Sequence, residues 1–151
     1  DEGDERSPRW RLVADATSPP FRRVAADPVL VDAPCTGLGV LRRRPDARWR
    51  IDAGAPERLA ALARSIVDAA VPLVAPGGVL VVSVCTLTAV ESTGLDEWLA
   101  TAHPGLEPLE LPGGAWRPWG RGAVLLPQDA GTDGMCLFRY RVPASTILPG
   151  R

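Results

Sequence analysis

Two cysteines, each at the end of an apolar run, are the residues of this sequence best suited to covalent chemistry. The run VLVDAPC carries Asp32 and ends at Cys35, and the run VLVVSVC ends at Cys85. A cysteine thiolate can form covalent intermediates with a substrate. A buried cysteine is, however, more often a small core side chain. The two runs by themselves leave both interpretations open.

The apolar runs predict the strands that would position these side chains. Short buried strands are expected at residues 10–14 and 29–31, and a continuous β-branched run predicts a third at 79–84. In an open α/β sheet, ligands bind beyond the carboxyl ends of the strands. We therefore expect the acids and thiols that follow these strands to lie along one edge of the sheet: Asp15, Asp32, Cys35 and Cys85.

The rest of the chain alternates between helical and strand patterns. After a loop at 33–55, apolar residues recur at helical spacing from Pro56 onward: Leu59, Leu62, Ile66, Ala69 and Leu73. Thr88 and Glu91 have the spacing of a capping box, which predicts that a second helix starts there. Cys136 lies in an alternating strand and is expected in the core. Further strands are expected at 106–111, 123–126 and 135–142. This order of elements predicts an α/β fold with a mainly parallel sheet.

Composition and length limit the classes of protein that this sequence can represent. The chain has 151 residues, of which 46% are hydrophobic and 23% charged, as expected of one globular domain. It has no apolar run of about 18 residues and no signal-peptide pattern, so we expect a cytoplasmic protein without a membrane span. The three cysteines lack the close spacing of a disulfide framework or a zinc site, and no metal is expected.

Positive charge is concentrated in one segment, although the net charge of the chain is only −1. Every basic residue is an arginine, and one group falls between two predicted elements: Arg42, Arg43, Arg44, Arg48 and Arg50. Guanidinium groups bind phosphate oxygens bidentately, and an aromatic side chain such as Trp49 can stack on an unstacked RNA base. The segment thus suits contacts with phosphate groups, and a solvated loop is the alternative.

Four segments resemble motifs of the RNA 5-methylcytosine methyltransferases of the Fmu (Sun) type. VLVDAPCTGLGVLRRRPDARWR at 29–50 resembles the fourth motif, and VSVCT at 82–86 resembles the sixth. ADAT at 14–17 is similar to the third motif, and LLPQDAGTDGM at 125–135 to the closing segment. The resemblance divides the chain into a polar lead-in at 1–9, the C-terminal portion of a methyltransferase catalytic domain at 10–142, and a tail at 143–151.

The resemblance implies a fold, a cofactor and a reaction. The fold is a partial Rossmann-like methyltransferase fold, with a mainly parallel sheet, a C-terminal antiparallel strand and the first strands missing. The cofactor is S-adenosyl-L-methionine, and the substrate is cytosine C5 in RNA, for which the 16S ribosomal RNA is expected. We expect no membrane partner, and the oligomeric state stays open.

The resemblance also implies a role for each site residue. Cys85 would add to cytosine C6 as the nucleophile, and Cys35 would assist product release. Asp32 would contact the cytosine and lie near the cofactor, and Asp15 would bind the adenine amine of the cofactor. DNA cytosine methyltransferases use a Pro-Cys cysteine as the nucleophile instead, which would make Cys35 the attacking residue. The second cysteine and the arginine segment favour the RNA assignment.

One part of the family pattern is absent from the 151 residues. The family binds its cofactor through a glycine-rich loop after its first strand, and the similar letters APGG at 75–78 follow a helix instead. We therefore expect this chain by itself to be inactive and to bind the cofactor weakly. The alternative is a non-catalytic RNA-binding fragment or degenerate methyltransferase-fold module. Sequence upstream of Asp1 would distinguish the two.

Overall fold

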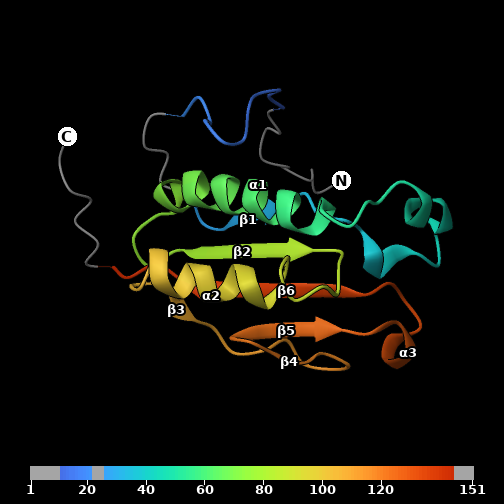
Figure 1. Ribbon diagram of the computed structural model, residues 1–151. Helices are drawn as coiled ribbons and strands as arrows, with labels where there is room; N and C mark the ends of the chain where they lie inside the picture. Colours follow the sequence, from blue (N-terminus) through green and yellow to red (C-terminus); the bar gives the residue numbers. More distant parts are fainter. Residues whose placement is uncertain (1–10, 22–25, 145–151) are drawn as a thin grey trace, which may run out of the picture.

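A mixed sheet with helices packed against it forms the fold (Figure 1). The computed structural model describes residues 11–21 and 26–144. The strands are β1 (Val29–Asp32), β2 (Val79–Val84), β3 (Glu107–Pro108), β4 (Arg117–Trp119), β5 (Gly122–Leu125) and β6 (Met135–Arg141). The helices are α1 (Ala55–Ala70), α2 (Thr93–Ala102) and α3 (Pro127–Ala130), with 3-10 turns η1 (Leu38–Val40), η2 (Pro45–Trp49) and η3 (Val71–Leu73).

The order of strands across the sheet is β1-β2-β6-β5-β4, and β3 also pairs with β6. β1 and β2 are parallel, whereas β6 runs antiparallel to both of its neighbours, β2 and β5. The α/β class and the antiparallel last strand are therefore confirmed. Among the described strands, however, β1–β2 is the one parallel pair. β6 makes three antiparallel pairs, with β2, β3 and β5, and only two residues join β4 to β5, a connection too short for parallel strands.

α1 and α2 lie side by side over one face of the sheet, as Figure 1 shows. α1 begins at Ala55 with a proline in its first turn, as the sequence predicted. Its buried stripe falls one residue later than expected and consists largely of alanines: Ala60, Ala63, Val67 and Ala70. Small side chains let the helix backbone approach the sheet, so the bulkier Leu62 lies outside the stripe and is exposed.

The core lies between these helices and the middle strands. Leu80, Val82 and Val84 of β2 are fully buried, and so are Phe138 and Tyr140 of β6. Cys136 is also buried, which confirms the predicted alternation in the last strand.

Three local predictions were wrong. Residues 11–14 form no strand, because no described strand pairs with them, and Val13 is fully exposed; the predicted first residue of that strand, Trp10, lies outside the described residues. The strand expected at 106–111 is reduced to β3, since the last strand pairs with only two of its residues. The segment predicted as a loop at 33–55 contains η1 and η2.

The predicted lead-in at 1–9 lies outside the described residues, as does most of the predicted tail. Within residues 11–21 and 26–144, no helix has both the length and the apolar character needed to cross a membrane.

Candidate functional site

The two cysteines meet where the parallel strands β1 and β2 end. The register pairs Asp32 with Ser83, so the segments that follow the two strands leave the sheet side by side. As a result, the Sγ atoms of Cys35 and Cys85 lie 3.3 Å apart, although 50 positions separate them in the chain. Parallel pairing thus brings together two thiols that the sequence places far apart.

Asp32 lies beside this pair at the end of β1. Its carboxylate accepts a hydrogen bond of 2.8 Å from the Ser83 hydroxyl, and the side chain is otherwise exposed. Ser83 belongs to the neighbouring strand, so the hydrogen bond orients the carboxylate relative to the end of β2. Asp32 also lines two separate cavities, one with the thiols and one on the side of residues 11–21.

The cavity that contains the thiols has a volume of about 390 Å³. Its walls come from the segment after β1, the end of β2 and the start of β6, and they include Asp32, Cys35, Arg43, Arg44, Cys85, Asp133 and Met135. Asp133 is held by an ion pair with Arg43. The cavity therefore combines two thiols, carboxylates and guanidinium groups, which suits a polar, planar substrate.

The thiol of Cys35 is half-buried where it lines the cavity. Burial, together with the neighbouring Cys85 thiol, raises the pKa of Cys35 to about 12. At neutral pH Cys35 is therefore protonated and can donate its hydrogen to the sulfur of Cys85. Cys136 is a core thiol outside this cavity; burial raises its pKa to about 11, and its Sγ donates to the Thr86 carbonyl.

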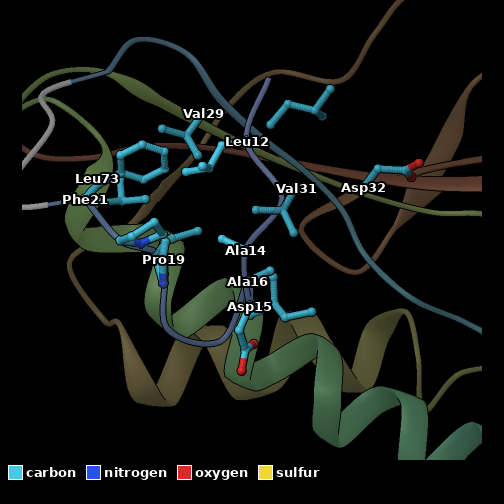
Figure 2. A pocket seen from close by; sticks show the side chains of 14 residues that line it. Leu12, Ala14, Asp15, Ala16, Pro19, Phe21, Val29, Val31, Asp32 and Leu73 are labelled. Atoms are coloured by element: carbon cyan, nitrogen blue, oxygen red, sulfur yellow. The ribbon is translucent and has the colours of Figure 1, made fainter. Parts of the chain in front are cut away.

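A second cavity, of about 360 Å³, lies between residues 11–21, β1 and α1. Figure 2 shows its apolar side chains gathered around Leu12, Phe21 and Val29, with the carboxylate of Asp15 pointing away from that group. Asp15 accepts hydrogen bonds from the backbone N–H and the hydroxyl of Thr17, which lower its pKa. Among residues 11–21 and 26–144, donors reach only one of its carboxylate oxygens, so with respect to these residues the other is available as an acceptor.

The arginine segment is partly neutralised. Arg42 donates to the Gly131 carbonyl, Arg43 pairs with Asp133, and Arg50 pairs with Asp46. The side chain of Arg44 makes no hydrogen bond or ion pair with the described residues, and it lines the thiol cavity. Arg48 stacks on the exposed ring of Trp49, with its guanidinium carbon 5.1 Å from the ring centroid. Arg44, Arg48 and Trp49 are thus the members most accessible to a ligand.

Gly39 packs tightly against the segment that carries Cys85. Its N–H donates to the Cys85 carbonyl at 2.9 Å, and its carbonyl accepts from the N–H of Gly134 at 2.8 Å. A Cβ at this position would collide with backbone atoms on both sides. The glycine therefore connects the segments after β1 and β2 with the start of β6.

Sequence reasoning missed three polar residues of this region. Ser83 and Asp133 gave no local signal, because their partners lie far away in the chain. Glu91 was interpreted as part of a capping box, but α2 begins at Thr93 with Ser92 as its N-cap. The Glu91 side chain instead turns into the protein, where it binds the residues that follow both cysteines.

The chain is similar to ribosomal RNA methyltransferases in sequence. Residues 11–140 match the family described as 16S rRNA methyltransferase RsmB/F. Ribosomal RNA small subunit methyltransferase B of Thermus thermophilus is 43% identical over 94 residues, which are 62% of this chain and 23% of that protein. Ribosomal RNA small subunit methyltransferase F of Cronobacter sakazakii is 36% identical over 125 residues, 79% of this chain and 26% of that protein. The chain thus spans about a quarter of the length of these curated relatives.

Solved structures agree with this similarity. NSun6 from Pyrococcus horikoshii, solved with SFG, superposes with a TM-score of 0.73 at 29% identity. The matched region covers 86% of this chain and 33% of the NSun6 chain. PH0851 superposes with a TM-score of 0.70 at 27% identity, and the matched region covers 74% of this chain and 25% of the PH0851 chain. The predicted Rossmann-like methyltransferase fold and the resemblance to RNA methyltransferases are both confirmed. This chain belongs to the 16S rRNA methyltransferase RsmB/F family.

Proposed function

We propose that this chain forms the substrate side of the catalytic pocket of a methyltransferase that modifies cytosine C5 in RNA, with 16S ribosomal RNA as the expected substrate. The observation that carries the proposal is the pair of thiols 3.3 Å apart beside the carboxylate of Asp32. Membership of a 16S rRNA methyltransferase family supports the substrate class.

The chemical difficulty of this reaction explains the need for a thiol. Cytosine C5 is a poor nucleophile, and addition of a thiolate to C6 gives C5 the character of an enamine carbon. Covalent addition divides one difficult step into easier ones. We assign this addition to the Sγ of Cys85, while the carboxyl group of Asp32 binds the cytosine edge and polarises the ring.

Release of the methylated RNA requires that the bond between Cys85 and cytosine C6 be broken again. After C5 has lost its proton, the bond between C6 and the Cys85 sulfur breaks, and the electron pair of that bond returns to the sulfur. The Cys35 thiol is protonated at neutral pH because burial raises its pKa, and it lies within hydrogen-bond distance of the departing sulfur. A hydrogen bond from Cys35 stabilises the developing thiolate, so Cys35 is the release partner.

The cavity between residues 11–21 and β1 is the proposed site for S-adenosyl-L-methionine. Its apolar walls fit an adenine ring, and Asp32 joins this cavity to the thiols. Asp15 is assigned to the adenine amine, which its carboxylate would reach by turning toward the apolar side chains. When bound, the cofactor supplies an electrophilic methyl group. The related NSun6 was solved with SFG, an analogue of this cofactor, which supports the identity of the cofactor.

RNA binding is assigned to the arginine segment. Arg44 and Arg48 are proposed to contact phosphates, and the exposed Trp49 ring to stack on an unpaired base. Arg42 and Arg43 would join them on exchanging their internal partners for phosphate oxygens. Each guanidinium that replaces a counterion on the RNA makes binding more sensitive to salt.

Trapping the covalent adduct tests the assignment of the two cysteines. The full protein is incubated with 16S rRNA and S-adenosyl-L-methionine, and the protein–RNA adduct is measured on a denaturing gel. The Cys35→Ala variant is expected to accumulate the adduct because release is impaired, and Cys85→Ala is expected to form none. Adduct in Cys85→Ala but not in Cys35→Ala would reassign the nucleophile, and no adduct in either variant would contradict covalent catalysis.

The 151 residues by themselves are proposed to have little or no activity. They contain no glycine-rich loop for the cofactor, and the cavity that contains Asp15 offers few polar groups. Calorimetric titration of this chain with S-adenosyl-L-methionine is expected to give weak binding. A micromolar dissociation constant would contradict that expectation.

A further inference from the structure

Glu91 is a buried carboxylate that the proposed reaction does not use. Its side chain is only 1% exposed, and it lies in the segment between β2 and α2. The Oε1 atom accepts from the N–H of Thr36 at 2.7 Å. The Oε2 atom accepts from three hydroxyl groups, those of Thr36, Thr86 and Thr88, at 2.6 to 2.9 Å. A buried carboxylate is costly unless it is fully hydrogen-bonded, and these four donors meet that requirement.

Two of the donors to Glu91 are neighbours of the two cysteines in the sequence. Thr36 directly follows Cys35, and Thr86 directly follows Cys85. The two threonine hydroxyls also lie 3.1 Å from each other. Glu91 therefore connects the residue after one thiol to the residue after the other, across two segments that belong to different strands.

Two simpler roles for Glu91 do not agree with the structure. The carboxylate does not cap α2, because no side chain caps that helix and its N-cap residue is Ser92. It is also not among the residues that line the thiol cavity, so it is not placed to contact a substrate there. Its hydrogen bonds reach the catalytic region only through Thr36 and Thr86.

We propose that Glu91 is a positioning residue that fixes the separation of the Cys35 and Cys85 sulfurs by holding Thr36 and Thr86 in register. The inference deepens the proposed function and rests on it for its catalytic meaning. The carboxylate matters because it accepts at all four positions. A glutamine of the same shape offers one accepting oxygen and one donating nitrogen, so the hydroxyls on the Oε2 side must reorient.

The separation of the sulfurs can be measured without any methyltransferase assay. In a glutathione redox buffer, the two thiols transfer two electrons and two protons to one oxidised glutathione, which leaves as two reduced glutathione molecules. The equilibrium constant for the Cys35–Cys85 disulfide reports how closely the sulfurs are held. Peptide mapping by mass spectrometry distinguishes this disulfide from products of Cys136.

The Glu91→Gln variant is expected to lower this equilibrium constant by about tenfold or more, since small displacements of reacting groups have large effects. Asp96→Asn is the matched control. Asp96 is equally buried and accepts hydrogen bonds from Arg121 and Tyr140, but it lies on the α2 side of the core. Both variants are expected to lower the melting temperature, and only Glu91→Gln is expected to change the disulfide equilibrium.

A second variant covers the case in which Glu91→Gln does not fold. Thr36→Val keeps the shape and the backbone N–H of Thr36 but removes the hydroxyl that binds Glu91, and it is expected to shift the equilibrium in the same direction by a smaller factor. In the full enzyme, Glu91→Gln is expected to lower kcat with little change in the KM for RNA.

Three outcomes overturn the inference: an unchanged disulfide equilibrium in folded Glu91→Gln, an equal change in Asp96→Asn, or an unchanged equilibrium in Thr36→Val. If the protein methylates no RNA but the equilibrium shifts as expected, the proposed function fails while the positioning role stands.

Discussion

Substitution of Gly39 by alanine tests the packing between the segments that follow β1 and β2. A Cβ at residue 39 would lie 2.8 Å from the carbonyl carbon of Gly134 and 3.0 Å from the carbonyl oxygen of Cys85. Both obstacles are backbone atoms, which cannot rotate away as a side chain can. The hydrogen bonds of residue 39 to Cys85 and Gly134 would therefore break or lengthen.

The expected loss of stability follows from these contacts. Two weakened hydrogen bonds cost about 1 kcal/mol each, and forcing a methyl group into packed backbone costs about 1–3 kcal/mol. Gly39→Ala is thus expected to lower the free energy of unfolding by about 3–5 kcal/mol, a large share of the roughly 5–15 kcal/mol typical of a domain.

Urea unfolding followed by tryptophan fluorescence measures this change as a shift of the midpoint. Gly113→Ala is the matched control, because a Cβ there meets nothing within 4 Å. The control is expected to stay within about 0.5 kcal/mol of the unsubstituted chain. A Gly39→Ala variant that also stays within that range would refute the argument that this backbone contact holds the site together.

Three other predictions address the core, the thiols and the RNA surface. Asp96→Asn is expected to lower the free energy of unfolding by about 2–3 kcal/mol in thermal unfolding, because the charged acceptor of the Tyr140 hydroxyl is lost; a change below about 0.5 kcal/mol would contradict this. Burial raises the pKa of Cys35 to about 12 from an ordinary value near 9. The unfolded chain therefore loses this proton at lower pH than the folded chain. The contribution of the Cys35 thiol to the free energy of unfolding is fully present below about pH 9 and is lost as the pH rises above it. Urea midpoints across this range are expected to fall less steeply for Cys35→Ala, and an identical slope would refute the assignment. Arg44→Ala is expected to weaken RNA binding and to reduce the salt dependence of log K by about one unit, whereas Arg141→Ala, at the opposite end of the sheet from the thiols, is expected to leave that slope unchanged.

The sequence predicted the parts of the fold that depend on local patterns. The β-branched run at 79–84 gave β2 with the same bounds, and the alternation at 136–142 gave the buried face of β6. The helix from Pro56 was also found, but its buried stripe was not, since periodicity favours large apolar residues and the sheet selects small ones. Residues 11–14 have a strand-like composition, but no strand in the described part of the chain pairs with them, and pairing is a long-range property that composition does not contain.

The candidate site likewise has residues that local patterns predicted and residues that they did not. The strand ends predicted that Asp15, Asp32, Cys35 and Cys85 would share one edge. The parallel pair β1–β2 brings the last three together, whereas Asp15 follows a segment that forms no strand, and it lines the other cavity. Glu91 could not be assigned, since the capping-box spacing gave a local explanation that satisfied the pattern. Two of its donors, Thr86 and Thr88, are near in the chain, but Thr36 lies 55 positions away, and only the folded backbone brings it to Glu91.

The place of β6 within the sheet has a consequence for protein synthesis. The thiol cavity is completed by Asp133 and Met135, at the start of a strand that must insert between β2 and β5. At a translation rate of about 5–20 residues per second, the 50 residues from Cys85 to Met135 take about 3–10 s to synthesise. During that interval the nascent chain has both cysteines but no β6 to pair with β2. The thiols therefore lack the wall that Asp133 and Met135 supply until β6 has been made, so the complete cavity forms only with this last strand.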